Sequence, residues 1–273
     1  MPKVAVVTGA SSGIGAEFAR KLAGRGFDLL LVARRQDRLL ALARELSDQY
    51  GIAAEAWPAD LTDPATLEAL AARVQNTPAL GLLVNNAGFG TNGYFFETDV
   101  RSQTQMHLLH VVAVTRLTHA ALANMVPRGE AGTGVINVAS VAAFGSSPLN
   151  VSYCATKAWM NRFCEGLSLE LGGRGSPVTV QALCPGFVLS EFHDVLGIDR
   201  TKLPSWMWMT PDFVVQESLR GFDRRKQMVV PGWRYRILVG VMRVVPGSWQ
   251  RAVSARAVRR YRLSKSASES DAG

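Results

Sequence analysis

The feature that most constrains the fold is a glycine-rich turn close to the N-terminus. The apolar run Lys3–Thr8 predicts a strand, which leads into Thr8-Gly9-Ala10-Ser11-Ser12-Gly13-Ile14-Gly15 and then into a helix over Gly13–Arg25. Glycines allow a tight turn, and the free amides of the first helical turn attract a pyrophosphate, which the helix dipole also favours. An ordinary strand-to-helix turn rarely needs three glycines, so this segment indicates a dinucleotide-binding site.

Apolar strands alternate with helical patterns along the chain. Strands that are apolar on both faces and separated by helices indicate a parallel sheet covered on both sides. We therefore predict a single doubly wound (Rossmann) α/β domain with a mostly seven-stranded parallel sheet over residues 1–232, and a C-terminal helical extension over 233–263. The polar residues 264–273 are expected to be disordered. The predicted strands are Lys3–Thr8, Phe27–Ala33, Ile52–Trp57, Gly81–Asn85, Val135–Val138, Val178–Cys184 and Met228–Val230, and the predicted helices are Gly13–Arg25, Arg35–Tyr50, Pro64–Gln75, Val100–Met125 and Val151–Leu171.

The net charge of +8 originates in the last fifth of the chain. Residues 1–220 carry 18 basic and 19 acidic residues, whereas residues 221–273 carry 12 basic and 3 acidic residues. The electrically neutral body argues against a nucleic-acid partner. On a helical wheel the segment Arg251–Leu263 is basic and amphipathic, which fits peripheral contact with an anionic membrane surface and equally fits docking on the domain or on a second subunit.

The sequence also bears on the compartment of the protein. No apolar run approaches the ~20 residues that a membrane-spanning helix needs, and the N-terminal residues lead directly into the first strand rather than into a secretory signal. The three cysteines, Cys154, Cys164 and Cys184, are an odd number and predict reduced thiols. We expect a cytoplasmic protein, with any membrane contact peripheral and on the inner face.

Five motifs follow one another in a recognisable order. The G-x-x-x-G-x-G turn is followed by Asn85-Asn86-Ala87-Gly88, Ser140, Tyr153-x-x-x-Lys157 and Pro185-Gly186. Together they resemble the short-chain dehydrogenase/reductase family over about residues 3–190. The segments Asn86-Ala87-Gly88-Phe89-Gly90 and Val229-Val230-Pro231-Gly232 are similar to a bacterial, ketoacyl-reductase-like subgroup. The resemblance implies an oxidoreductase that binds a nicotinamide dinucleotide and assembles as a homodimer or homotetramer.

The end of the second strand indicates which dinucleotide is bound. An NAD site needs a carboxylate there for the ribose 2′-hydroxyl, whereas a 2′-phosphate needs a guanidinium. The sequence offers Arg34 and Arg35 and no acidic residue, which favours NADP(H). The alternative is that these arginines are solvated residues at the start of the next helix, as Arg38 is expected to be.

The resemblance also implies which residues contact the cofactor. Asp60 and Leu61 would lie at the adenine, residues 86–88 under the adenosine ribose, and residues 185–190 at the nicotinamide end, while Asp63 or Thr62 is the better candidate to cap the next helix. The complete predicted cofactor set is Gly9, Ser11, Ser12, Gly13, Ile14, Gly15, Arg34, Arg35, Asp60, Leu61, Asn86, Ala87, Gly88, Tyr153, Lys157, Pro185, Gly186, Val188 and Ser190.

The predicted catalytic group is Ser140, Tyr153 and Lys157. Tyr153 and Lys157 are four residues apart in a helical segment and therefore share one face. A neighbouring ammonium is expected to lower the pKa of a phenol, which is otherwise near ~10. The resemblance implies hydride transfer to a carbonyl carbon, with Tyr153 donating the proton and Ser140 hydrogen-bonding the oxygen.

One position departs from the family pattern. Where the family has a helical asparagine that supports a water relay to the lysine, the segment from Met106 to Thr115 has His110. An imidazole can hold a water or carry a proton, so we include His110 among the catalytic candidates. The alternative is that His110 is a tolerated helix residue and the relay is weakened.

The region after Ser190 covers the substrate in the family, so residues 190–212 are predicted to form a lid. Its aromatic and methionine side chains make a large, adaptable apolar surface that suits a bulky ketone or a 3-oxoacyl group, although core or dimer packing would explain them too. The predicted substrate residues are Phe192, Trp206 and Met207, and no metal is predicted. The leading hypothesis is an NADPH-dependent carbonyl reductase; the alternatives are a dinucleotide-binding protein with weak or no turnover, because of His110, and an alcohol dehydrogenase running in the oxidative direction.

Overall fold

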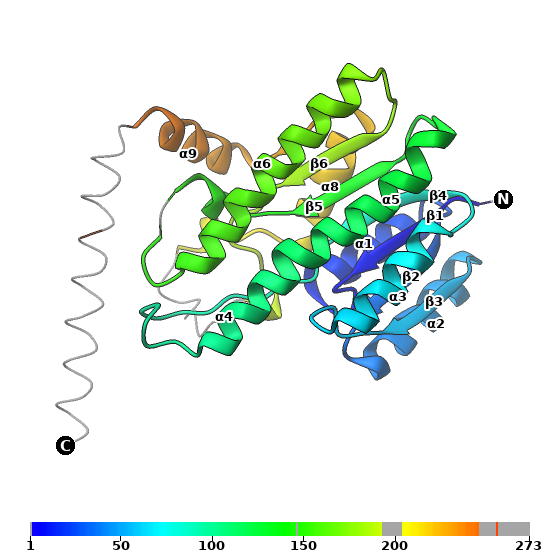
Figure 1. Cartoon of the computed structure of the whole chain (residues 1–273), viewed down its shortest axis with the longest axis horizontal. Coiled ribbons are helices and arrows are strands. Elements are labelled where there is room, and N and C mark those ends of the chain that lie inside the picture. The colour runs from blue at the N-terminus through cyan, green and yellow to red at the C-terminus, as the bar shows by residue number, and fades with distance from the viewer. Residues whose placement is uncertain (1, 146, 193–203, 246–254, 256–273) are drawn as a thin grey trace.

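The computed structural model describes residues 2–145, 147–192, 204–245 and 255. Seven strands form one sheet in the order β3-β2-β1-β4-β5-β6-β7, and all neighbouring strands are parallel (Figure 1). This order confirms the predicted doubly wound α/β fold. The strands are β1 (Val4–Thr8), β2 (Asp28–Ala33), β3 (Ala54–Pro58), β4 (Leu80–Asn85), β5 (Gly134–Val138), β6 (Thr179–Leu183) and β7 (Met228–Val229).

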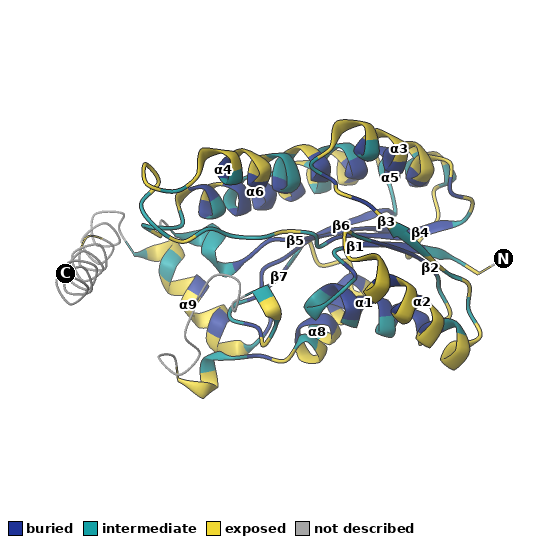
Figure 2. Ribbon diagram, turned by 90° about the horizontal axis from the view of Figure 1, so that it is seen from below, coloured by how far each residue is buried: buried dark blue, intermediate teal, exposed yellow. Residues whose placement is uncertain are grey.

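Helices lie on both sides of the sheet. Figure 2 shows α3, α4, α5 and α6 on one side and α1, α2, α8 and α9 on the other. The helices are α1 (Gly13–Ala23), α2 (Gln36–Tyr50), α3 (Pro64–Gln75), α4 (Val100–His107), α5 (Val114–Arg128), α6 (Val151–Gly173), α8 (Pro211–Asp223) and α9 (Trp233–Val244). Three short helices complete the described elements: η1 (Leu108–Ala113), η2 (Val141–Phe144) and η4 (Ser205–Met207).

Each helical layer shares a hydrophobic core with one face of the sheet. Phe18, Leu31 and Leu46 are fully buried on the side of α1 and α2, and Leu70 and Leu83 are fully buried on the side of α3 and α5. Burial on both faces explains why β1, β2, β4, β5 and β6 are largely apolar, whereas the edge strand β3 alternates and exposes Glu55.

The order of the strands reverses at β1. Val6 in β1 pairs with Leu30 of β2 on one side and with Leu83 of β4 on the other. Ligands of open α/β sheets bind outside the carboxyl ends of the strands at such a reversal. The glycine-rich turn follows β1 and therefore lies at this point.

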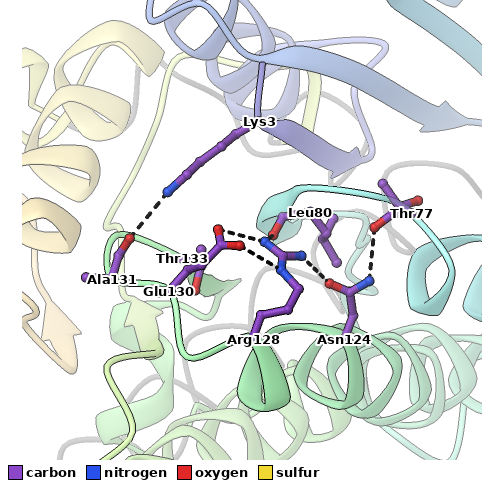
Figure 3. A network of polar contacts seen from close by, with 8 residues as sticks. All are labelled: Lys3, Thr77, Leu80, Asn124, Arg128, Glu130, Ala131 and Thr133. Carbon is purple, nitrogen blue, oxygen red and sulfur yellow. Dashed lines mark hydrogen bonds and ion pairs between the residues drawn. The ribbon is translucent and has the colours of Figure 1, made fainter. Parts of the chain in front are cut away.

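A polar network fastens the opposite, amino-terminal edge of the sheet (Figure 3). The Arg128 guanidinium at the end of α5 donates to both carboxylate oxygens of Glu130, at 3.1 and 2.9 Å, and to the carbonyl oxygen of Leu80 where β4 begins. Asn124 donates to the carbonyl oxygen of Thr77 at 3.0 Å, and Lys3 donates to that of Ala131. These contacts join the end of α5 and the loop after it to the starts of β1 and β4.

The predicted helix Val100–Met125 is divided by the π-helical segment η1, which separates α4 from α5. Apolar periodicity distinguishes a helix from a strand, but it does not reveal one extra residue in a single turn. η1 contains the buried His110. Single π turns inside α-helices are frequent at functional sites, so the local structure and the unusual residue point to the same place.

The helix α9, which starts at Trp233, lies in the predicted C-terminal extension. Its side chains Tyr235 and Val239 are buried, and Tyr235 belongs to the core on the α1 side. The predicted basic helix Arg251–Leu263 and the predicted disordered tail 264–273 lie outside the described residues, apart from position 255. None of the helices in the described ranges is long and apolar enough to cross a membrane, and the three cysteines there are buried and form no disulfide.

Candidate active site

The glycine-rich turn forms a narrow cradle at the end of β1. Gly9 has a left-handed backbone with φ of +66°, and a Cβ on Gly15 would lie 2.2 Å from the carbonyl oxygen of Gly9. Any side chain at these two positions would therefore strain or displace the turn. Gly13 begins α1, and Ile14 packs against the core. The backbone amides at the start of α1 are thus presented as the pyrophosphate of a dinucleotide requires, so these residues fit such a cofactor.

Arg35 connects the cradle to the end of β2. Its guanidinium donates to the hydroxyl of Ser11 at 2.9 Å and to that of Ser12 at 2.7 Å. It also pairs with Glu191 at 2.7 Å, and Arg38 pairs with the other oxygen of the same carboxylate at 2.6 Å. Hydrogen bonds from Arg38 and Arg35 lower the pKa of Glu191 to about 2, so this carboxylate is ionised at physiological pH.

The ion pairs of Glu191 with Arg35 and Arg38 were not predicted. Arg38, expected to be a solvated helix residue, holds Glu191, and Glu191 itself was not a candidate. A lone glutamate after the last family motif gives no signal in the sequence, because its partners are more than 150 residues away. Arg34 is exposed and makes no side-chain hydrogen bond within the described part of the chain.

The candidate adenine residues follow β3. The Asp60 carboxylate accepts hydrogen bonds from the amide and the hydroxyl of Thr62 at 2.9 and 2.8 Å, and Leu61 is buried in the core. Asp63 is the N-cap of α3 and accepts from the amide of Thr66, which confirms one of the two predicted capping residues.

Asn86 and its neighbours bring the end of β4 against the cradle. The Asn86 side chain donates to the carbonyl oxygens of Thr8 and Gly9 at 2.9 and 3.2 Å. The backbone amides of Asn86 and Ala87 donate to the Thr8 hydroxyl. The carboxyl ends of β1 and β4 are therefore joined directly, next to the place where a dinucleotide would lie.

The three predicted catalytic side chains meet after β5 and on α6. Tyr153 and Ser140 are hydrogen-bonded. The buried Lys157 lies with its Nζ atom 5.7 Å from the Tyr153 ring centroid and donates to the carbonyl oxygen of Val138 at 2.7 Å. Ser140 also accepts from the amide of Ala142, which fixes its hydroxyl at the start of η2.

The expected lowering of the tyrosine pKa is wrong for this structure. Burial raises the pKa of Tyr153 to about 12, and the hydrogen bond with Ser140 opposes that rise. Burial also lowers the pKa of Lys157 to about 7, so the lysine is only partly charged near neutral pH and is a weaker source of positive potential than a full ammonium. Both shifts have one cause, which is the removal of charged forms from water.

His110 lies beside this group and is enclosed by protein. Its Nδ1 atom is 3.0 Å from the hydroxyl of Thr156, which itself donates to the carbonyl oxygen of Tyr153. Its Nε2 atom accepts a hydrogen bond from the backbone amide of Phe89 at 3.3 Å. Because the Thr156 proton points to Tyr153, Nδ1 carries the imidazole proton and donates it to Thr156.

The environment keeps this imidazole neutral. Burial, together with the positive charge of Lys157, lowers the pKa of His110 well below its usual value. The ring lies 5.9 Å from the Tyr153 ring in an edge-on arrangement. A Cβ on Gly88 would come within 2.6 Å of the His110 Nε2 atom, so the glycine of the Asn86-Ala87-Gly88 motif makes room for the histidine.

The predicted nicotinamide segment runs across the carboxyl end of β6. The carbonyl oxygen of Pro185 accepts from the amide of Val141, and Val188 forms a parallel bridge with Met209. Tyr235 of α9 supports this segment, since its hydroxyl accepts from the amide of Phe187 at 3.0 Å and donates to the carbonyl oxygen of Met207 at 2.7 Å. Gly186 lies beneath the Tyr235 ring, and Ser190 lies against Gly13 of the cradle.

The three predicted substrate residues are placed differently. The Phe192 ring lies 5.8 Å from the Tyr153 ring, which puts it beside the candidate proton donor. Trp206 is exposed and stacks on the Arg234 guanidinium of α9 at 5.5 Å, while Met207 is half-buried and is held through its backbone by Tyr235. The lid residues 193–203 lie outside the described ranges. The contribution of Tyr235 was not predicted, because a tyrosine in the C-terminal extension gives no sign of its partners.

The fold and the site define a class of protein: a Rossmann-type oxidoreductase with a Ser-Tyr-Lys group at the carboxyl edge of the sheet. The family model described as short chain dehydrogenase matches residues 3–200. The chain belongs to this family, whose members act on a carbonyl or hydroxyl group and use NAD(H) or NADP(H).

Three similar proteins illustrate the range of relatives. A very-long-chain 3-oxoacyl-CoA reductase from Laccaria bicolor is 30% identical over 86% of this chain and 70% of its own. A short-chain dehydrogenase from Sphingobium yanoikuyae, solved in complex with NADPH, is 38% identical with a TM-score of 0.80, covering 90% of this chain and 97% of its own. The bulky-bulky ketone specific alcohol dehydrogenase from Comamonas testosteroni is 31% identical with a TM-score of 0.75, covering 96% of this chain and 94% of its own.

Proposed function

We propose that this protein is an NADPH-dependent reductase of carbonyl groups on hydrophobic substrates, either bulky ketones or 3-oxoacyl groups. The observation that carries the proposal is that Ser140, Tyr153 and Lys157 meet at the carboxyl edge of the sheet. The glycine-rich turn lies at the same edge, and Arg35 contacts it through Ser11. A fold alone would not support this conclusion, because the same fold hosts many activities.

Each member of the group has a distinct role in the proposal. Bound NADPH supplies the hydride that reduces the carbonyl carbon. Tyr153 gives its phenolic proton to the carbonyl oxygen, and its raised pKa keeps that proton in place at neutral pH until it is needed. The Ser140 hydroxyl hydrogen-bonds the same carbonyl oxygen. When Lys157 is protonated, its positive charge favours the Tyr153 phenolate that remains after the proton transfer.

The proposed cofactor preference depends on the arginines at the end of β2. The Arg35 guanidinium, with the hydroxyls of Ser11 and Ser12, forms a cluster of donors where a 2′-phosphate would lie, and exposed Arg34 stands beside it. The carboxylate expected of an NAD site is missing from the sequence at this strand end. Support also comes from the Sphingobium relative, which was solved with NADPH.

The proposed substrate class depends on the apolar surroundings of Tyr153. Phe192 lies next to its ring, and the segment that carries Trp206 and Met207 is fastened to α9. Two relatives support the same substrate class, since one is named as a 3-oxoacyl-CoA reductase and another as a bulky-bulky ketone specific alcohol dehydrogenase. For assembly, a homodimer or homotetramer is proposed, and the exposed apolar residues Val112, Val151 and Leu169 on α6 and near it support a contact between copies.

The substrate class is tested by NADPH oxidation against 3-oxoacyl thioesters of increasing chain length and ketones of increasing bulk. The proposal predicts turnover that rises with apolar size and is much slower with NADH. NADPH binding, followed by tryptophan fluorescence, without turnover on any substrate would instead favour a dinucleotide-binding protein. Faster oxidation of the matching alcohols with NADP⁺ at neutral pH would favour an alcohol dehydrogenase.

A further inference from the structure

The outer face of helix α9 is an apolar stripe that faces solvent. Trp233, Ile237, Val241 and Val244 are 62%, 58%, 49% and 79% exposed. Their spacing of four, four and three residues places them on one side of the helix. These four residues are called the α9 outer face below. Single exposed apolar residues are ordinary, but a continuous row on one helix marks an interaction surface.

The inner face of α9 is already in use, so this stripe is not a core face that lacks its contacts. Tyr235 and Val239 are buried, and Tyr235 is hydrogen-bonded to the segment 187–207. The Met242 side chain reaches Gly145, and the Arg243 guanidinium lies 5.0 Å from the centre of the Phe144 ring. The helix is therefore fixed to the domain on one side and presents the α9 outer face on the other.

Arginines border the stripe on both sides. On a helical wheel Arg234 flanks one side and Arg236 flanks the other, where it also pairs with Glu217 of α8 at 3.4 Å, while α9 itself contains no acidic residue. The Arg234 guanidinium stacks on the rings of Trp233 and Trp206, at 5.2 and 5.5 Å, so the exposed Trp206 extends the apolar surface. The sequence after residue 245 adds six basic residues and two acidic ones.

This charge pattern distinguishes between two occupants. If two copies paired through this face, the arginines of both helices would meet at one interface; α9 offers no carboxylate of its own, and Glu217 of α8 is already paired with Arg236 within the chain. An anionic lipid surface presents phosphate groups to the arginines and an apolar layer to the side chains between them. A helix with apolar residues on one face and arginines at its borders fits that surface.

We propose that the α9 outer face docks on the surface of an anionic phospholipid bilayer. The proposal concerns a described helix and is separate from the expectation for residues 251–263. Trp206 and Met207 contact α9, so docking would bring the predicted substrate segment close to the lipid. This consequence rests on the proposed function, whereas the docking does not.

The test is flotation of the full chain with vesicles of phosphatidylcholine alone or with about one third phosphatidylglycerol. We expect binding to the anionic vesicles only, and weaker binding as salt rises. Ile237→Asp should weaken binding at least about tenfold, because it places a carboxylate in the apolar layer. Leu40→Asp, on exposed α2, makes the same change in charge and should bind as the wild type does. Far-UV circular dichroism checks that both variants fold.

Three results would overturn the proposal. The first is vesicle binding by Ile237→Asp equal to that of the wild type, which would assign any lipid contact to another part of the chain. The second is a lower oligomer mass of Ile237→Asp in light scattering with unchanged vesicle binding, which would make this face a contact between copies. The third is a failure of the wild type to bind anionic vesicles. None of these readouts requires turnover, so failure of the proposed function would leave the test valid.

Discussion

At the scale of single residues, His110 shows how one substitution is accommodated. The sequence left open whether this imidazole carries protons or is merely tolerated. In the structure both ring nitrogens are engaged, one with Thr156 on the catalytic helix and one with the Phe89 amide on the loop after β4. The neutral ring therefore holds two parts of the site together, and we infer a positioning role rather than a relay.

The first prediction concerns His110. His110→Ala leaves the Phe89 amide and the Thr156 hydroxyl without this partner, so the free energy of unfolding should fall by about 2–4 kcal/mol in urea. His110→Asn should show a smaller loss in the free energy of unfolding than His110→Ala does. Because the ring stays neutral, the pH profile of kcat/KM should have the same shape in wild type and His110→Asn between about pH 5 and 8. A titration that disappears in His110→Asn would contradict the positioning role.

The second prediction concerns Lys157, whose pKa burial lowers from 10.5 to about 7 in the folded, cofactor-free protein. Above pH 7 the unfolded chain still holds this proton and the folded chain has released it. Since stability rises with pH wherever the unfolded state binds more protons, the free energy of unfolding should increase from pH 7 towards 10.5.

Urea denaturation at neutral and at mildly alkaline pH checks this change. The wild type should gain up to about 2 kcal/mol relative to Lys157→Met, in which the titrating group is absent. Other ionisable groups titrate equally in the two proteins and cancel in the difference. A difference that stays constant with pH would show that the lysine keeps its ordinary pKa despite its burial.

At the scale of elements, the start of the lid is tied to the cofactor site by charge. Glu191 follows the nicotinamide segment, and Arg35 and Arg38 at the start of α2 hold its carboxylate. Under the proposed preference for NADPH, the 2′-phosphate would meet the same arginines, so the carboxylate and the phosphate would compete for them. The position of the arginines after β2 predicts a role at the cofactor, but the sequence could not reveal a partner that only the folded chain brings near.

The third prediction follows from this competition. Glu191→Gln removes the competing charge, so NADPH should bind about two- to fivefold more tightly, a small effect because the ion pair is exposed. NADH lacks the phosphate and should bind with nearly unchanged affinity. Tryptophan fluorescence titration measures both. Weaker NADPH binding, or an equal change for NADH, would show that Glu191 does not compete with a phosphate.

At the scale of the whole molecule, the sequence predicts most of the fold because its strands are continuous apolar runs between helices. The seven strands and the approximate bounds of α1, α2, α3 and α6 follow from that pattern, whereas the reversal at β1 and the helix α8 were not predicted. The motif residues could be placed at one edge because the carboxyl ends of parallel strands meet there. The π-helical η1 and the support of residues 187–207 by Tyr235 depend on tertiary contacts that no local pattern encodes.

The central claim is that Tyr153 supplies the proton for carbonyl reduction. The most direct measurement is the NADPH-dependent kcat/KM of Tyr153→Phe on the best apolar ketone or 3-oxoacyl substrate, compared with Tyr50→Phe on exposed α2 as a matched control. We predict a loss of at least about 100-fold for Tyr153→Phe, with NADPH binding retained and Tyr50→Phe unchanged. Turnover by Tyr153→Phe close to that of the wild type would contradict the account.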